Sequence, residues 1–447
     1  MQSFLLFIYS VALWAVQPLL RFKLKRRAAL EPLYGQFTEE RFGYYSEGAG
    51  EHAGGQGFVW IHAVSLGETR AAAILLASLR QQMPTMQLLL THSTATGRQE
   101  GAKLLRAGDQ QVWLPWDTQG ATQRFFSHFK PRLGIIMETE VWPNLCAAAQ
   151  QAGVPMALAN ARLSDASLRK AQRIAWLAQP AYASFAQVWA QTQPDAQRLA
   201  SAGAHHTTVL GNIKFDATLP AAQLAEGRAW RAALAKPVVL LASSREGEET
   251  LFTKEIWHFS DVDIEKLAIN SVVNVSGTTH AQKVQAVQWL VVPRHPQRFD
   301  EVAALLKQAG LSVSRRSDWA GTPEPADVWL GDSLGEMALY YAMADCALLG
   351  GSFAPLGGQN LIEAIAAGCP VVMGPHTFNF ADAASTAQDH GAACRVQDMA
   401  QGVQTALQLA CTDAQKQAMQ RAGEQWLALS RGAVQRTAQA VSAMLKR

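Results

Sequence analysis

The chain has 447 residues, of which 49% are hydrophobic, and its formal net charge at pH 7 is only +3. This length provides roughly two or three domains with sizeable cores, so a disordered chain is excluded. The small charge, without a patch of interleaved arginine and aromatic residues, argues against nucleic acid as a partner. The five cysteines and eleven histidines show no CxxC or HExxH spacing, so we expect reduced cysteines and neither a metal nor another cofactor.

Residues 3–20 form an uncharged, mostly apolar run that is followed at once by the basic stretch 21–27. The run is at the short end of the about 17–25 residues that cross a bilayer, so it fits either a transmembrane or an interfacial helix. The basic residues follow the run instead of preceding it, which argues against a cleaved signal peptide. We expect a membrane anchor over residues 1–27, and the positive-inside rule then places the rest of the chain at the cytoplasmic face of the membrane.

Short apolar runs alternate with helical patterns along the rest of the chain. Continuous apolar runs are typical of parallel strands that are covered on both faces. We expect an α/β domain over residues 28–216 and a similar one over 237–447, with a linker at 217–236 and a helical pattern without interruption from residue 413 onward. The long, mixed segment 250–287 is expected to be a surface insertion. The predicted strands are residues 58–64, 86–92, 133–139, 154–160 and 187–191 in the first domain, and residues 237–243, 288–293, 327–332, 345–350 and 370–374 in the second.

Polar residues follow the first predicted strand at its carboxyl end, where doubly wound folds bind ligands. Ser65 and Glu68 fit the S-x-x-E pattern of a capping box, which begins a helix. Glu68 also fits a general base, because a partly desolvated carboxylate in a cleft accepts protons readily. The spacing by itself slightly favours the helix cap.

Glu138 and Glu140 end another predicted strand, and alternation puts them on one side of it. Three roles fit two carboxylates at this position: metal ligation, binding of substrate hydroxyl groups, and a salt bridge to Arg162. The salt bridge is the simplest of the three. The polar run 91–96 similarly fits either an anion site or a helix cap.

The stretch 350–374 combines a glycine-rich turn, a polar helix start and a buried strand. Gly357 and Gly358 allow the backbone to approach a ligand closely, and Asn360 can cap a helix whose amino end faces the turn. Together these features predict a phosphate site. Glu363 fits either a capping box with Asn360 or a carboxylate that binds ribose hydroxyls, and the spacing does not decide between them.

Two other segments of the second domain place polar groups after predicted strands. Arg294 follows one strand, where a guanidinium suits a phosphate or a carboxylate. Gly335, Glu336 and Met337 begin a helix after another strand. They fit an ordinary helix start with an acidic first turn, which is the simpler interpretation, or backbone contacts to a base or ribose.

A series of motifs between residues 58 and 380 follows the order found in one family of enzymes. The motifs are WIHAVSLGET, METEVWPNL, NARLS, GNIKFD, EGEE, VPRHPQRF, GDSLGEM, GGSFAPLGGQNLIEA and GPHTFNF. With them the chain resembles the Kdo transferases of lipopolysaccharide biosynthesis. These are membrane-associated glycosyltransferases with two Rossmann-like domains facing across a cleft (the GT-B fold), which move 3-deoxy-D-manno-octulosonic acid (Kdo) from CMP-Kdo to a lipid A precursor.

The resemblance implies that Glu68 is the general base, which reverses the preference for a simple cap. It makes Glu138, Glu140, Arg162 and Lys214 candidates for substrate binding. It also implies that the second domain binds CMP through three groups of residues. These residues are Pro293, Arg294, Gly335, Glu336, Met337, Asn360, Leu361, Ile362 and Glu363.

The implied reaction is a direct displacement with inversion at the anomeric carbon of Kdo, in which Glu68 removes the proton from a glucosamine hydroxyl of the acceptor. Arg294 and the helix start at Asn360 would stabilise the leaving CMP, whose single phosphate makes a metal ion unnecessary. The first domain would hold lipid IVA at the inner membrane, and the second would hold CMP-Kdo. The chain departs from the family pattern at Arg245, where a histidine is usual, and in the length of segment 250–287.

Two other functions are consistent with these patterns. One is a sugar-nucleotide enzyme of similar fold with another donor, such as a UDP-sugar. The other is a non-catalytic, membrane-tethered binding protein. A comparison of CMP and UDP binding tests the first, and replacement of Glu68 tests the second.

Overall fold

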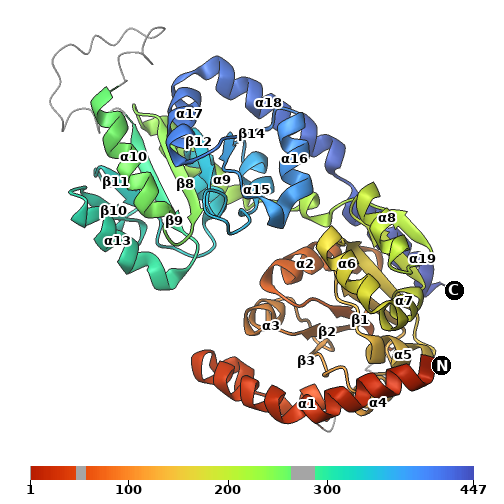
Figure 1. Ribbon diagram of the computed structural model, residues 1–447. Coiled ribbons are helices and arrows are strands. Elements are labelled where there is room, and N and C mark those ends of the chain that lie inside the picture. The colour runs from red at the N-terminus through yellow and green to blue at the C-terminus, as the bar shows by residue number, and fades with distance from the viewer. Residues whose placement is uncertain (1, 47–56, 263–286, 447) are drawn as a thin grey trace. The chain divides into compact units, whose positions relative to one another are not determined.

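The chain folds into two compact α/β units (Figure 1). The computed structural model describes residues 2–46, 57–262 and 287–446. The first unit comprises Met1–Ala217 and Ser430–Arg447, and the second comprises Thr218–Leu429. Each unit contains a seven-stranded sheet in which the paired strands run parallel. The predicted pair of α/β domains with parallel sheets is therefore confirmed.

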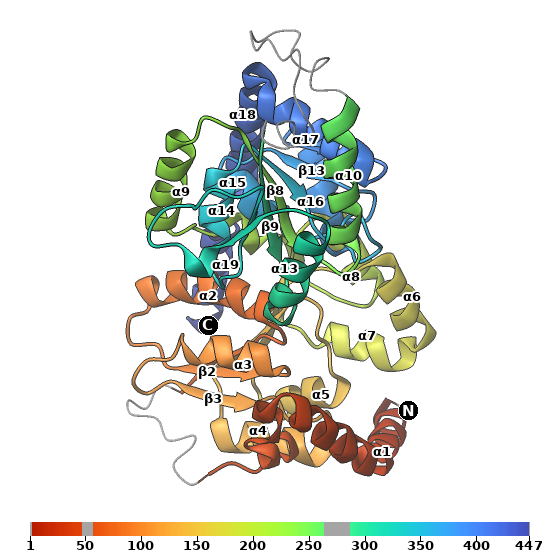
Figure 2. The ribbon, with the colours of Figure 1, turned by 90° about the vertical axis from the view of Figure 1, so that its left-hand side faces the viewer.

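The sheet of the first unit has the strand order β3-β2-β1-β4-β5-β6-β7. Because successive side chains of a strand point to opposite faces, Val59 and Ile61 enter one core and Trp60 enters the other. Helices α2 and α19 cover the first face, and α4, α5, α7 and α8 cover the second (Figure 2). The strands are β1 Val59–His62, β2 Leu88–His92, β3 Gln110–Trp113, β4 Leu133–Met137, β5 Met156–Ala161, β6 Gln187–Ala190 and β7 Thr207–Val209. The helices are α1 Gln2–Leu30, α2 Leu66–Gln82, α3 Ala95–Ala102, α4 Gln119–Phe129, α5 Pro143–Gln151, α6 Asp165–Arg173, α7 Ala175–Ala183, α8 Gln193–Ser201 and α19 Ala433–Leu445, with 3-10 helices η1 Pro32–Gly35, η2 Thr38–Phe42 and η3 Ile213–Asp216.

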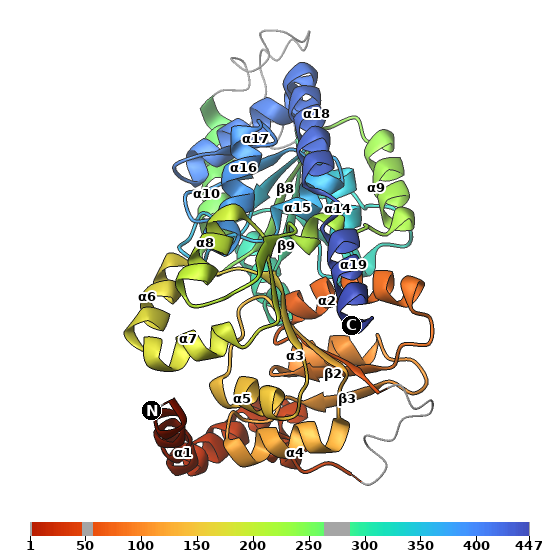
Figure 3. The ribbon, with the colours of Figure 1, turned by 90° about the vertical axis from the view of Figure 1, so that its right-hand side faces the viewer.

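The sheet of the second unit has the order β10-β11-β9-β8-β12-β13-β14. Helices α10, α13 and α17 cover one face (Figure 2), and α9, α14 and α15 lie on the other (Figure 3). The strands are β8 Val238–Ser244, β9 Gln288–Pro293, β10 Val313–Arg315, β11 Val328–Leu330, β12 Cys346–Leu349, β13 Val371–Met373 and β14 Ala393–Arg395. The helices are α9 Ala221–Ala233, α10 Glu248–Val262, α13 Phe299–Gln308, α14 Met337–Met343, α15 Leu361–Ala366, α16 Ala381–Asp389, α17 Met399–Cys411 and α18 Asp413–Ser430, with 3-10 helices η6 Pro296–Arg298, η7 Arg316–Asp318 and η8 Phe378–Phe380.

Three expectations about the connections need correction. The segment expected as a linker, 217–236, contains α9, and a Cβ on its Gly227 would lie only 2.4 Å from the carbonyl oxygen of Leu339 in α14. The helical pattern after residue 413 is interrupted at Gly432, which has a φ of 93° and precedes α19. Helix α19 packs against α2, so residues 430–447 belong to the first unit instead of the range 237–447. The expected insertion, 250–287, begins within α10. Its residues 263–286 lie outside the described residues.

Candidate active site

The first turn of α2, which follows β1, holds Glu68 at the carboxyl end of the first sheet. Ser65 caps α2, since its Oγ accepts a hydrogen bond from the N–H of Glu68 at 3.4 Å. The Glu68 carboxylate folds back over the turn and accepts from the N–H of Val64 at 2.8 Å and from the Ser65 hydroxyl at 3.1 Å. The predicted helix cap is therefore present. A carboxylate has about four lone-pair positions, so about two remain for a substrate.

The pKa of Glu68 is raised to about 7, chiefly by burial and also by the nearby charges of Glu138 and Glu140, against the opposing effect of the hydrogen bonds from Val64 and Ser65. A base whose pKa lies near neutrality combines a useful fraction of the ionised form with a real affinity for protons. The same carboxylate can thus cap a helix and serve as a general base.

Glu138 follows β4 in the left-handed backbone region, with a φ of 61°, so the alternation expected along the strand does not continue through it. Its side chain is buried between two cations. Lys214 Nζ lies 2.6 Å from Oε1, and Arg162 Nε lies 3.0 Å from Oε2. Burial raises the pKa of Glu138, but the charges of Lys214 and Arg162 outweigh it and bring the pKa below its ordinary value. The predicted salt bridge to Arg162 is confirmed.

Glu140 is half-buried, and burial raises its pKa. Since β1 and β4 are neighbours in register, with His62 opposite Ile136, the residues that follow them meet at one edge of the sheet. The structure thus gathers Glu68, Glu138, Glu140, Arg162 and Lys214 in the first unit. Their combination of one carboxylate near neutrality with an adjacent ion pair suits proton abstraction beside a charged or hydroxyl-rich substrate.

Removing the Lys214 charge should destabilise the protein, because among the described residues the half-exposed Arg162 would be the one cation left to pair with Glu138. We expect Lys214→Met to lower the free energy of unfolding by about 3 kcal/mol, which is the lower end of the range found when one partner of a buried ion pair is removed. Lys103→Met is the matched control, since it breaks the exposed pair between Lys103 and Glu100, which contributes about 0.3–0.5 kcal/mol. Urea unfolding of both variants gives the comparison, and equal losses would contradict the assigned role of the Glu138 pair.

Two buried histidines lie beneath this edge, and no sequence pattern points to them. His62 Nδ1 lies 3.1 Å from the carbonyl oxygen of Thr91, and His92 Nδ1 lies 2.8 Å from that of Ala63. The Nε2 atoms of both rings are buried without a hydrogen-bond partner among the described residues. Burial lowers the pKa of His62 to about 3 and that of His92 to about 4. Both rings are therefore neutral.

The glycine-rich turn of the second unit follows β12. Gly357 and Gly358 have φ values of 90° and 73°, as the predicted tight turn requires. Asn360 caps α15 by accepting from the N–H of Ile362 at 3.1 Å. The side chains of Leu361 and Ile362 are buried in the core, so these two residues can face a ligand only with their backbone groups.

Arg294 lies beside this turn at the end of β9. Its Nε donates to Gln359 Oε1 at 3.1 Å, and its side chain is exposed, whereas the neighbouring Pro293 is buried. The turn and Arg294 come from β12 and β9, which flank β8 in the sheet. The structure thus brings together the predicted arginine and the predicted phosphate turn.

The third predicted group, at the start of α14, is linked to the same strand ends. Ser243 Oγ lies 3.8 Å from the sulfur of Met337, and Ser243 has a φ of 55° where the register of β8 and β9 shifts. Glu336 pairs with Arg316 at 2.9 Å, and Gly335 has a φ of 83°. All the predicted CMP-binding residues thus lie within the second unit.

In the described part of the chain, no group of three or more His, Cys, Asp or Glu side chains is placed to hold a metal ion. All five cysteines are free, as reduced residues are. Cys146, Cys346 and Cys369 are buried, as we expect from the sequence. Cys394 is half-buried and Cys411 is exposed, so these two do not lie in a core.

Helix α1 lies along the first unit and is held there by polar contacts. The Tyr9 hydroxyl donates to Asp117 Oδ2 at 2.9 Å, and the Ser10 hydroxyl donates to Asn144 Oδ1 at 2.9 Å. Asp117 in turn accepts from the N–H groups that begin α5. Within residues 2–46, 57–262 and 287–446, no helix combines the length and the apolar character needed to cross a membrane.

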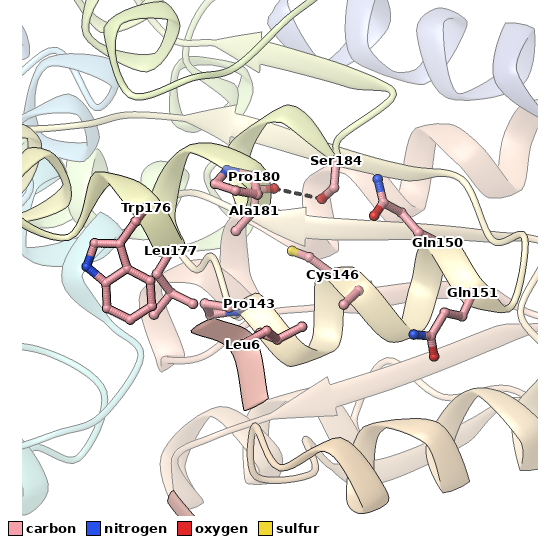
Figure 4. A pocket seen from close by; sticks show the side chains of 11 residues that line it. Leu6, Pro143, Cys146, Gln150, Gln151, Trp176, Leu177, Pro180, Ala181 and Ser184 are labelled. Carbon is pink, nitrogen blue, oxygen red and sulfur yellow. Dashed lines mark hydrogen bonds between the residues drawn. The ribbon is translucent and has the colours of Figure 1, made fainter. Parts of the chain in front are cut away.

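Two cavities flank α1. The smaller, of about 240 Å³, is lined by residues that include Leu6 of α1, Pro143 and Cys146 of α5, and Trp176 and Pro180 of α7 (Figure 4). The larger, of about 450 Å³, combines apolar and basic side chains, and these include Phe7, Val11, Trp14, Arg21, Phe42, Tyr44 and Arg124. Both cavities are thus lined partly by the helix that the sequence marks as a membrane segment.

The pair of α/β units has a GT-B-like fold. A glycosyltransferase from Rickettsia africae of known structure superposes with a TM-score of 0.54 over 88% of this chain and 99% of that one, at 12% identity. This similarity is one of fold alone. The sequence comparisons are more specific.

Residues 36–217 match the family model described as 3-deoxy-D-manno-octulosonic-acid transferase (kdotransferase). The 3-deoxy-D-manno-octulosonic acid transferase of Bordetella pertussis is 47% identical over 97% of this chain and 98% of its own length. That of Haemophilus influenzae is 30% identical over 99% of both chains. The chain belongs to the 3-deoxy-D-manno-octulosonic acid transferase family, as the motifs predict.

Proposed function

We propose that this enzyme transfers Kdo from CMP-Kdo to a hydroxyl group of a lipid A precursor, lipid IVA, in lipopolysaccharide biosynthesis. The observation that supports the chemistry most directly is the half-buried carboxylate of Glu68, with its pKa near 7, at the carboxyl end of the first sheet. Lys214 and Arg162 lie in the same unit, where they can meet the negative charges of acceptor and sugar.

In the proposed reaction the hydroxyl oxygen of the acceptor attacks the anomeric carbon of Kdo. The bond from that carbon to the phosphate oxygen breaks, its electron pair leaves with CMP, and the acceptor proton passes to Glu68. Attack opposite the leaving group inverts the configuration. A buried ion pair such as that of Glu138 and Lys214 is preorganised, so Lys214 can stabilise the charge that develops during displacement without rearranging.

The second unit is proposed to bind the CMP part of the donor. Arg294 would contact the phosphate beside the glycine-rich turn, and the start of α14 would contact the nucleoside. Because α15 has only six residues, we assign the phosphate chiefly to Arg294 and the backbone N–H groups of the turn, and less to the helix dipole.

The test of this function is an incubation of the purified protein with lipid IVA and CMP-Kdo formed in the reaction vessel, followed by mass spectrometry of the lipid. A mass gain of one or more Kdo groups supports the proposal and counts the sugars added. Binding of UDP in preference to CMP would favour another sugar-nucleotide donor. Binding of CMP without transfer to any acceptor, unaffected by replacing Glu68, would favour a non-catalytic binding protein.

We also propose that α1 binds in the plane of the cytoplasmic leaflet of the inner membrane. Helix α1 exposes large apolar residues: Trp14 is 71%, Leu19 67% and Phe22 62% exposed. The basic stretch 21–27, which contains Phe22, follows Trp14 and Leu19, and such stretches are attracted to anionic lipids of that leaflet. The cavities beside α1 would then lie where acyl chains of the acceptor arrive.

Trp14→Glu should weaken binding to vesicles of phosphatidylethanolamine and phosphatidylglycerol. Loss of a large apolar side chain from the interface removes about 1.5–3 kcal/mol, which corresponds to at least about a tenfold lower partition coefficient. Leu429→Glu is the matched control, because Leu429 is 75% exposed in the second unit. Sedimentation with vesicles measures both variants, and equal binding of the two would contradict a membrane role for α1.

A further inference from the structure

The motif EGEE contains a carboxylate that the proposed reaction does not use. Glu248 is fully buried, and its oxygens accept four hydrogen bonds from backbone N–H groups. The donors are Gly351 at 2.7 Å, Arg245 at 2.9 Å, Phe353 at 3.1 Å and Ala354 at 3.2 Å. The carboxylate thus fills a nest of N–H groups that is formed largely by the first part of the glycine-rich turn.

The first part of the turn holds the second part through its backbone. The carbonyl of Gly351 accepts from the N–H of Gly358 at 2.8 Å, and that of Gly350 accepts from the N–H of Gln359 at 3.1 Å. Gln359 then accepts from Arg294 Nε at 3.1 Å. Hydrogen bonds, together with the peptide links from Gly350 to Gly351 and from Gly358 to Gln359, therefore connect the buried carboxylate to the exposed guanidinium.

Close packing fixes the same turn from other directions. A Cβ on Gly350 would lie 2.4 Å from the carbonyl oxygen of Ser243, so only glycine fits there. Ser352 Oγ accepts from the N–H of Gly374 at 2.8 Å, which ties the turn to the end of β13. The turn is therefore preorganised, and Glu248 is the charged group at its base.

We propose that Glu248 is a positioning residue for the donor: it holds the glycine-rich turn in the shape that places Arg294 beside the phosphate of CMP-Kdo. The proposal rests on the donor role proposed above for the second unit. Glu248 itself does not contact the donor, since it is fully buried. Glutamine cannot replace it, because one end of an amide is an NH₂ group, which would face N–H donors on either side.

The experiment measures the dissociation constant of CMP by calorimetry with the full chain, beside thermal unfolding. We expect Glu248→Gln to raise the dissociation constant by about tenfold, the cost of a turn that must be ordered on binding. Asp345→Asn is the control. Asp345 is another buried carboxylate of this unit, bonded to the N–H of Val238 at 2.8 Å at the amino ends of β8 and β12, so its loss should lower the unfolding temperature and leave CMP affinity unchanged.

A double-mutant cycle with Arg294→Ala separates positioning from general damage. If Glu248 acts through Arg294, the Glu248→Gln change should have a much smaller effect on CMP affinity when Arg294 is absent. Unchanged CMP affinity of Glu248→Gln, or additive effects in the cycle, would overturn the inference. Failure of the unmodified protein to bind CMP would overturn the donor role itself, and with it this inference.

Discussion

Replacing Glu68 with glutamine should reduce the rate of Kdo transfer by about 10²–10⁴-fold, the usual contribution of a general base. Glutamine has nearly the same shape and can still accept from the N–H of Val64, so the start of α2 should persist. The amide cannot take up the acceptor proton. The turnover number, measured by mass spectrometry of the lipid, should fall while the dissociation constant of CMP stays constant.

Glu100→Gln is the matched control, since Glu100 is a carboxylate of α3 that pairs with the exposed Lys103. It should keep full activity. Retention of most of the activity by Glu68→Gln would assign Glu68 to the helix cap alone and remove the base from the mechanism.

The pH profile gives an independent test of the same residue. Because the pKa of Glu68 is raised to about 7, the ionised form that accepts a proton decreases below pH 7. We expect kcat/KM to fall about tenfold for each pH unit below that value. Glu68→Gln should lack this acid limb in its residual activity, and an identical limb in both proteins would assign the titration to another group.

Acidification should destabilise the first unit through His62 and His92. Their pKa values of about 3 and about 4 in the folded protein lie below the ordinary value of 6.5, so unfolding allows both rings to bind protons. Their stabilising contribution is complete above pH 6.5 and is lost as the pH falls toward the folded values. At pH 5 each ring should cost about 2 kcal/mol, or about 4 kcal/mol together, since one pKa unit corresponds to about 1.4 kcal/mol.

Urea unfolding at pH 7.5 and pH 5 measures this loss. The raised pKa of Glu68 acts in the opposite direction, so the comparison should be made with a variant that keeps Glu68. His62→Gln with His92→Gln should remove the loss of stability on acidification and leave the opposite effect of Glu68. A variant that loses as much stability as the unmodified protein on acidification would show that other groups dominate.

The apolar runs of the sequence predict the interior of both sheets and miss their edges. Every predicted strand is present, and the strands that these runs do not predict are β3, β7, β10 and β14, each at an outer edge. A central parallel strand is buried on both faces, so its sequence is continuously apolar. An edge strand such as β7, with the sequence TTV, is largely exposed and looks like an ordinary loop.

The parts of the site whose residues lie within one short motif could be predicted from the sequence, as the cap formed by Ser65 and Glu68 shows. The ion pair of Glu138 with Lys214 joins residues 76 positions apart. Spacing cannot show such a pair, because it depends on which strands are neighbours in the sheet. The left-handed backbone of Glu138 and the neutral state of His62 similarly depend on packing.

The return of α19 to the first unit has a consequence for biosynthesis. Ala433, Ala438 and Val441 are fully buried in the core beside α2. A ribosome adds these residues only after it has made the whole second unit, Thr218–Leu429. The face of α2 that receives α19 therefore stays open to solvent or to chaperones while the second unit is already free to fold, and the unit that carries Glu68 is completed afterwards.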